Sequence, residues 1–202
     1  MRKCRKCGEE KPLEEFGELS ASKDGKNPRC KPCVRDRQNT RNKLKHVQQY
    51  NINKAHKRRA IEKALPQDVT AGKWKAIMKR FGNRCFLTGS TNVSFEHVIP
   101  FATGHGGHIV ANLLPMDKAL NLSRQDKNFG EWFNTLEATI EMHDAFDEAF
   151  EYLAELNGLP VDLFWEYVYY CDAYRRTEEE IKADPRPSVE IFNDWKEAGG
   201  VI

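Results

Sequence analysis

The chain has 202 residues, 40% of them hydrophobic and 31% charged, which is enough to bury a core in one medium domain or two small ones. No apolar run approaches the ~18 residues that a membrane span needs, so we expect no membrane partner. The first residues, Met1 to Cys4, lack the apolar stretch of a signal peptide, and we therefore expect a cytoplasmic protein.

The net charge of +2 conceals a steep gradient along the chain. Residues 1–66 carry 19 Lys and Arg against 8 Asp and Glu, a net charge of +11. Residues 67–128 carry a net charge of +4, and residues 129–202 carry −13. This asymmetry predicts a polyanion that meets one end of the molecule. The acidic tail is interpreted as a solvated face, with an autoinhibitory or partner-binding surface as the alternative.

Two Cys-x-x-Cys pairs mark the first segment, residues 1–34. Cys4 and Cys7 form one pair, Cys30 and Cys33 form the other, and 22 residues separate the pairs. In a cytoplasmic protein this spacing favours a metal over disulfides, and four thiolates are the tetrahedral set that zinc prefers. We predict a structural zinc module, because so polar a segment cannot fold by burial alone. Free thiols or a redox pair are the alternative.

Residues 35–66 contain no Gly and no Pro before Pro66, and they are rich in Lys, Arg and Gln. They predict a basic helical linker, with a break near Asn51 to Asn53 and an end at Pro66. Four basic residues within it are predicted to contact phosphates: Lys54, Lys57, Arg58 and Arg59. Solubility alone is the alternative explanation for this basic run.

Residues 67–128 change from helical to extended patterns. Thr70 is predicted to cap a helix that ends at Phe81, with Gly82 just after it. Two extended pieces joined by a Gly-rich loop and then another helix are predicted next: Ser94–Ile99, His108–Pro115 and Asp117–Gln125.

Residues 129–202 are predicted to form an acidic helical region, with helices over Gly130–Leu156 and Val161–Tyr174 and a shorter piece after Pro187. Asn157 to Pro160 is a predicted break. The aromatic residues of this region are interpreted as core or interface rather than as a base-stacking platform. Helices with a few short strands between them indicate an α+β fold.

One constellation of polar residues lies in the middle of the chain: Glu96-His97 followed by Val98-Ile99-Pro100, the loop Gly104-His105-Gly106-Gly107-His108, Asn112-Leu113, and Asn121 nine residues after Asn112. This pattern resembles the HNH endonuclease family, over roughly the stretch from Arg84 to Lys127. The front module resembles the small Cys4 module found at the front of many phage HNH proteins. If the chain is phage-encoded, the cytoplasm would be that of a bacterial host.

The resemblance implies a small ββα-metal nuclease core and a role for each matching residue. His97 would be the general base that activates water, and Asn112 would hold the loop and His97 in position. Glu96 and Asn121 would bind a divalent ion, Mg²⁺ or Mn²⁺. An ordinary core histidine is the alternative for His97. Because neighbouring side chains of a strand point to opposite faces, Glu96 and His97 would need a bend to reach one phosphate.

This sequence departs from the family pattern at two places. Glu96 stands where Asp is commoner, which leaves the preferred metal open. Many members also carry a second Cys4 zinc site around the core, but Cys85 is followed by Thr88 instead of a second Cys, so that site is absent and Cys85 is predicted to be buried. His105 and His108 lie in the Gly-rich loop, where we expect exposed side chains that contact nucleic acid.

The leading hypothesis is a metal-dependent endonuclease that nicks or cleaves double-stranded DNA. One ββα module has one active site, so cutting both strands would need a homodimer or two successive nicks. The alternative is a binding protein with a catalytically silent HNH-like module. Homing, restriction, packaging and recombination share this pattern, and the sequence does not choose among them.

Overall fold

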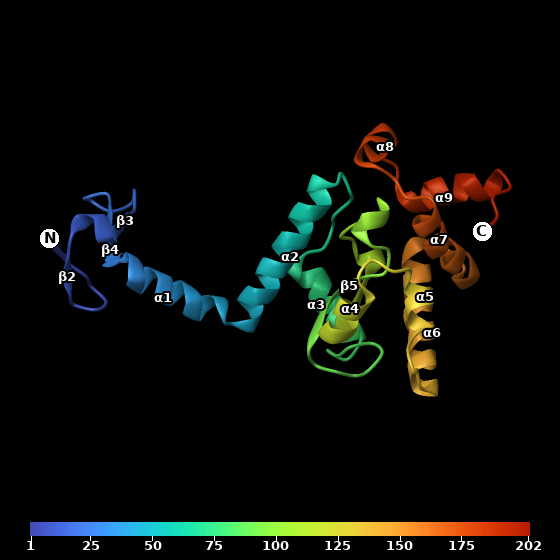
Figure 1. The fold of residues 1–202 in the computed structure, drawn as a ribbon, viewed down its shortest axis with the longest axis horizontal. Helices are drawn as coiled ribbons and strands as arrows, with labels where there is room; N and C mark the ends of the chain where they lie inside the picture. Colours follow the sequence, from blue (N-terminus) through green and yellow to red (C-terminus); the bar gives the residue numbers. More distant parts are fainter. The chain divides into compact units, whose positions relative to one another are not determined.

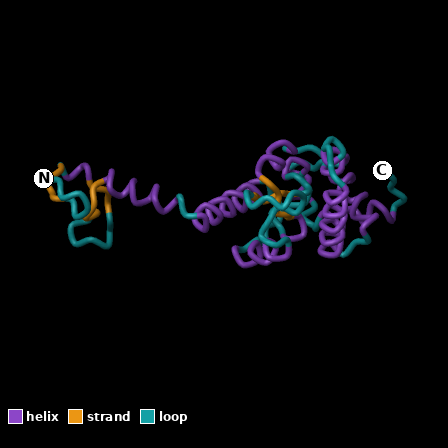
Figure 2. Tube along the Cα trace, turned by 90° about the horizontal axis from the view of Figure 1, so that it is seen from below, coloured by secondary structure: helices purple, strands orange, loops and turns teal.

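The computed structural model describes residues 1–202, apart from the side chains of residues 45 and 46. It confirms the α+β class, since the described chain combines helices with small two-stranded antiparallel sheets. The chain divides into two compact units, Met1–Ile52 and Asn53–Ile202 (Figure 1). Each unit contains short strands (Figure 2). The boundary lies within the predicted linker, and residues 67–128 share the second unit with residues 129–202.

The first unit is built from two β-hairpins and a helix. Strand β1 (Arg2–Lys3) pairs with β2 (Glu10–Lys11), and β3 (Phe16–Glu18) pairs with β4 (Lys26–Cys30). A 3₁₀ turn, η1, covers Leu13–Glu15, and α1 spans Lys31–Asn42. The buried cluster of this unit holds only Cys4, Phe16 and Cys30, with Cys33 packed against it. Apolar burial alone is therefore small here, as the sequence predicted.

The basic segment forms two helices, α1 and then α2 (Lys45–Glu62). The predicted break near Asn51 to Asn53 is wrong, because α2 runs through these residues and the interruption lies at Lys43 and Leu44. Asparagine weakens a helix without ending it, and the Asn53 side chain is held by hydrogen bonds to residues outside the helix.

Helix α3 (Ala71–Arg80) begins and ends where the sequence predicted. The Thr70 hydroxyl accepts a hydrogen bond from the Lys73 backbone N–H, and Gly82 adopts a φ of 59°. Trp74 and Ile77 on one face of the helix are buried against β5 and β6 side chains.

Strand β5 (Val93–His97) pairs with β6 (Leu113–Asp117) in a regular antiparallel register that ends at His97 opposite Leu113. The second strand starts later than predicted, because residues 110–112 form the 3₁₀ turn η3. A further 3₁₀ turn, η2, covers Phe101–Thr103. The predicted helix after β6 is confirmed as α4 (Lys118–Arg124), which contacts both strands.

The C-terminal part contains more helices than predicted: α5 (Phe129–Phe133), α6 (Ile140–Asn157), α7 (Val161–Ala173), α8 (Glu178–Ala183) and α9 (Ser188–Glu197). The predicted single helix over Gly130–Leu156 is wrong. Asn128 and Thr139 each accept hydrogen bonds from backbone N–H groups, so two separate helices start there. The break at Gly158, with a φ of 67°, is confirmed.

Helices α6 and α7 pack against each other (Figure 1). Their aromatic side chains belong to one core with residues of β6 and of the chain just after β5. Trp132, Phe133 and Tyr167 are buried in that core, which confirms the core interpretation of these residues. Cys85 is buried there too. The tail therefore supports the sheet that carries the polar constellation. None of the helices in the described chain combines the length and apolar character that crossing a membrane requires.

We expect Gly107→Ala to destabilise the second unit. Gly107 has a φ of 109°, and a Cβ at this position would overlap the Pro66 carbonyl. Backbone strain of this kind costs about 1–3 kcal/mol, which thermal unfolding of the full chain should show as a lower Tm. Gly72→Ala is the matched control, because a Cβ there meets only an ordinary contact in helix α3, and it should keep or raise the Tm. An unchanged Tm for Gly107→Ala would contradict the close packing of this loop.

Candidate functional site

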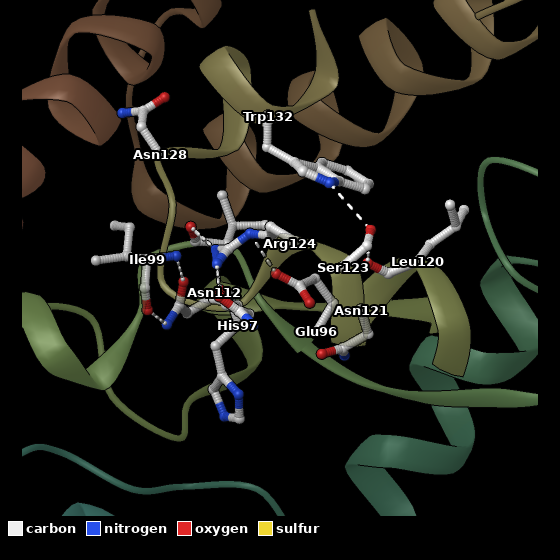
Figure 3. Close-up of polar contacts among 12 residues, drawn as sticks. Glu96, His97, Ile99, Asn112, Leu120, Asn121, Ser123, Arg124, Asn128 and Trp132 are labelled. Atoms are coloured by element: carbon white, nitrogen blue, oxygen red, sulfur yellow. Dashed lines mark hydrogen bonds and ion pairs between the residues drawn. The ribbon is translucent and has the colours of Figure 1, made fainter. Parts of the chain in front are cut away.

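The end of β5 presents two titratable side chains on opposite faces of the strand. Glu96 points towards α4, and His97 points towards the loop that follows η2 and towards α2 (Figure 3). The register stays regular up to His97, so the strand contains no bend. Both residues nevertheless line one pocket of about 460 Å³, because the strand ends there. Directly after His97 the chain bends, at Val98 and Ile99, which is where the sequence predicted a bend. That both side chains reach one phosphate stays a prediction.

Glu96 is buried beside Arg124 of α4. The Arg124 Nε lies 2.8 Å from the Glu96 Oε1, and both side chains are at most 3% exposed. The N–H is not aligned with the carboxylate, and neither atom has a hydrogen-bond partner among the described residues. Burial raises the pKa of Glu96, and the guanidinium opposes that rise. The sequence analysis did not single out Arg124.

Asn121 of α4 reaches back to β5. Its Nδ2 donates to the Phe95 carbonyl at 2.6 Å and to the Ser94 hydroxyl at 3.2 Å. Both amide protons are thereby used, and the Oδ1 has no hydrogen-bond donor among the described residues. Asn121 lines the same pocket as Glu96, and Figure 3 shows the two side chains next to each other. A carboxylate and a free amide oxygen are ligands that hard divalent cations accept.

Asn112 joins the segment after β5 to the Gly-rich loop. Its Oδ1 accepts from the Ile99 N–H at 2.7 Å, and its Nδ2 donates to the carbonyls of Ile99 and Gly107 at 2.9 and 3.0 Å (Figure 3). A side chain that is 2% exposed and makes three backbone hydrogen bonds fixes both segments relative to each other. The arrangement is the one expected of a loop-holding residue, although its role remains a prediction.

His97 lies among aromatic rings. The ring centroids of His56 and Phe101 are 4.9 and 4.5 Å away, and its Nε2 is 3.0 Å from the Nδ1 of His108. Burial, with the nearby histidines and arginines, holds the pKa of His97 well below its usual value. The imidazole is therefore neutral at pH 7, which is the form that can accept a proton. The sequence analysis did not connect His56, on α2, with this site.

The expectation that His105 and His108 are exposed is wrong, because both are fully buried. The His105 Nε2 is 2.7 Å from the Tyr174 carbonyl, which ties the loop to the C-terminal helices. His108 contacts His97 and Asn53. Both side chains are used within the fold, so the Gly-rich loop packs inward instead of presenting them to solvent.

Only some of the basic residues of α2 line the pocket that contains Glu96 and His97. Arg59 lines the pocket and lies over the Phe101 ring at 5.6 Å, and Lys63, which follows α2, lines the pocket too. Lys54 and Arg58 are exposed and Lys57 partly exposed, and none of these three is among the residues that line the pocket. With Arg124, the lining has three cations against the two acidic residues Glu96 and Asp126, which makes this pocket suited to an anion. Lys63 was not singled out in the sequence.

The four cysteines of the first unit come together as predicted. Their sulfur atoms all lie within 4.8 Å of one another. The Cys4 sulfur accepts N–H groups of Cys30 and Lys6 at 3.3 and 3.4 Å, and backbone hydrogen bonds, chiefly from Cys30, lower the pKa of Cys4 to about 5. Hydrogen bonding to Cys30 and burial raise the pKa of Cys33 to about 12. Four thiolates so close repel one another unless a cation lies among them, so this cluster suits a metal such as zinc.

A basic groove lies beside this cluster. Its cations come from three places in the first unit, namely Lys6, Arg29 of β4, and Arg37 and Arg41 of α1. The groove contains a single acidic residue, Asp36, among its lining side chains. Its charge favours a polyanion.

We expect the purified full-length protein to contain about one zinc ion per chain, measurable by elemental analysis. Replacing Cys4 and Cys7 by Ser should remove it, because two of the four ligands are lost, and should make residues 1–44 sensitive to protease. Cys85→Ala changes a cysteine outside the cluster and should retain the metal. Four freely titrating thiols and no zinc in the unaltered chain would end the zinc assignment.

The chain was compared with protein-family models, curated proteins and solved structures. No family model matches it, and no curated protein or solved structure matches it either.

Proposed function

We propose that this chain is a metal-dependent endonuclease of the HNH type that hydrolyses phosphodiester bonds in double-stranded DNA. The observation that carries the proposal is one pocket, at the junction of β5 and α4, that brings together a neutral histidine, two acidic side chains, a free amide oxygen and three cations. This combination is what a phosphodiester hydrolysis needs: a base, metal ligands and groups that attract phosphate.

The polar atoms fit a divalent ion such as Mg²⁺ or Mn²⁺. The Glu96 Oε1 faces Arg124, whereas its Oε2 has no hydrogen-bond donor among the described residues and is not enclosed. The Asn121 Nδ2 makes both hydrogen bonds of that amide, which leaves its Oδ1 free. These two side chains would hold the ion, leaving its other positions for water and phosphate. When bound, the ion would stabilise negative charge on the leaving oxygen. Its charge would also oppose the rise that burial imposes on the pKa of Glu96.

The chain's own residues would carry out the proton transfer. His97 takes a proton from water as the water oxygen forms a bond to phosphorus and the bond to the leaving 3′ oxygen breaks, and that oxygen then takes a proton from solvent. Arg59 and Lys63 attract the phosphate into the pocket. Asn112 keeps the segment after His97 in place.

One observation favours a second candidate, a DNA-binding protein without catalysis. The Arg124 guanidinium lies 2.8 Å from Glu96 and already neutralises the carboxylate that would hold the ion. In a silent module this pair would be purely structural. The two candidates differ in whether supercoiled plasmid is nicked or linearised when Mg²⁺ or Mn²⁺ is added.

We expect His97→Ala to lower plasmid cleavage by ~10²-fold or more, because the proton acceptor is lost, while DNA binding is retained. Glu96→Gln and Asn121→Ala should weaken activity in a way that a higher Mg²⁺ concentration partly restores. His143→Ala, an exposed histidine on α6, is the matched control and should cleave at the parental rate. Parental cleavage by His97→Ala would show that the base is elsewhere, and intact plasmid with the unaltered chain would favour the silent module.

We also expect the first unit to contribute DNA affinity through phosphates. Replacing Lys6, Arg29, Arg37 and Arg41 by Gln should weaken binding, and each lost phosphate contact should reduce the slope of log affinity against log salt by about 0.9. Titration of a labelled duplex at several salt concentrations measures this. Replacing Arg175, Lys182, Arg186 and Lys196 by Gln in the C-terminal part removes the same charge and should leave the slope unchanged. A parental slope in the fourfold variant would exclude the groove from the interface.

A further inference from the structure

Three side chains of the second unit form a hydrogen-bonded chain that ends at His97. The Asn53 Oδ1, from α2, lies 2.7 Å from the His108 Nε2. The His108 Nδ1 lies 3.0 Å from the His97 Nε2. The chain thus runs from a helix, through the Gly-rich loop, to the end of β5.

The far end of this hydrogen-bonded series, at Asn53, decides which atom donates in each of its hydrogen bonds. The Val69 carbonyl can only accept, and the Asn53 Nδ2 is 3.4 Å from it, so the amide oxygen of Asn53 faces His108. An amide oxygen can only accept, so the Nε2 of His108 must carry a proton. Burial lowers the pKa of His108 to about 4, so its ring is neutral and carries only this one proton. Its Nδ1 therefore holds a lone pair and accepts from the His97 nitrogen 3.0 Å away.

The proton between the two histidines therefore belongs to the Nε2 of His97. A neutral imidazole has one N–H, so the Nδ1 of His97 holds a lone pair. This atom has no hydrogen-bond partner among the described residues and is not one of the enclosed polar atoms, while His97 lines the pocket. When the Nδ1 gains a proton, the Nε2–H bond to His108 is unchanged. The same arrangement therefore suits the histidine before and after proton transfer.

The middle of the chain is held firmly. The His108 side chain is fully buried, its ring packs edge-on against Phe95 and stacks with His56, and its backbone N–H donates to the Pro66 carbonyl at 2.9 Å. His108 therefore cannot turn its ring over without disturbing the packing around it. Asn53 sets its tautomer, and His108 passes that constraint to His97.

We propose that Asn53 and His108 are positioning residues that keep His97 in the tautomer with its proton on Nε2, so that the Nδ1 is the atom that accepts the proton of the attacking water. Neither residue touches the phosphate. The catalytic part of this inference rests on the proposed nuclease function, whereas the tautomer itself does not.

The tautomer is measured directly by ¹H–¹⁵N correlation of the histidine rings in the ¹⁵N-labelled protein, without DNA and without added Mg²⁺ or Mn²⁺, with His97→Gln to assign the signals. We expect the Nε2–H pattern for His97 in the unaltered chain. Asn53→Leu removes the acceptor that orients His108, and it should transfer part or all of the His97 population to the Nδ1–H form. Asn53→Asp keeps an acceptor and should retain the original pattern. A backbone ¹H–¹⁵N spectrum and the Tm confirm that each variant is folded.

Plasmid cleavage then tests the catalytic consequence. Asn53→Leu should lose at least tenfold in rate at saturating DNA with little change in DNA affinity, and Asn53→Asp should recover most of that loss. An Nδ1–H pattern in the unaltered protein, or a pattern that Asn53→Leu leaves unchanged, would overturn the positioning role of Asn53 and His108 whatever the activity. If the tautomers are as expected but the protein never cleaves DNA, the positioning role of Asn53 and His108 is retained and the proposed nuclease function is overturned. The two failures are therefore distinguishable.

Discussion

The Arg124 guanidinium holds the end of β5, the end of α4 and the C-terminal core in one arrangement. It donates to the carbonyls of His97 and Val98, each at 2.7 Å, and to that of Gln125 at 2.8 Å, while its Nε faces Glu96. It also lies over the Phe129 ring, 5.1 Å from the centroid. Removing one partner of such a buried pair leaves an unpaired charge, which costs about 3–5 kcal/mol. The pocket therefore depends on an interaction that also stabilises the fold.

This arrangement explains why two adjacent residues of a regular strand can serve one pocket. The hydrogen bonds that Arg124 donates to backbone carbonyls hold the chain where β5 ends. Asn112 holds the segment two residues further on. Glu96 and His97 then lie on opposite sides of a strand end that the pocket surrounds. The placement of these two side chains is set by where the strand stops and the chain bends, at Val98 and Ile99.

The histidines show how burial changes the meaning of a residue type. In a Gly-rich loop, histidines are ordinarily exposed, yet His105 and His108 are fully buried because the glycines allow the chain to pass close to Pro66 and Arg176. Burial lowers the pKa of His108 to about 4, so the residue is neutral at pH 7 and can both donate and accept. A neutral, fixed imidazole can orient another one, which an exposed and charged histidine cannot do.

The sequence by itself determined the features that depend on local spacing. The two Cys-x-x-Cys pairs predicted the sulfur cluster because each pair places two thiols on one turn. Thr70 marked a helix start through its side-chain hydroxyl, and Gly158 marked a helix end through its permissive backbone. The spacing of Glu96, Asn112 and Asn121 was enough to single them out, although not to show how they meet.

Only the tertiary structure decided which distant residues join that site. Asn53, His56, Lys63 and Arg124 are separated from His97 by 27 to 44 positions, and nothing in their neighbourhood distinguishes them from solvated helix residues. The helix break at residues 134–139 was likewise hidden, because a continuous helical spacing of apolar residues does not reveal where a side chain will cap a new helix. Such contacts arise from the packing of α2 and α4 around β5. Hydrophobic periodicity indicates that an element has a buried face, but it does not show which residues that face will meet.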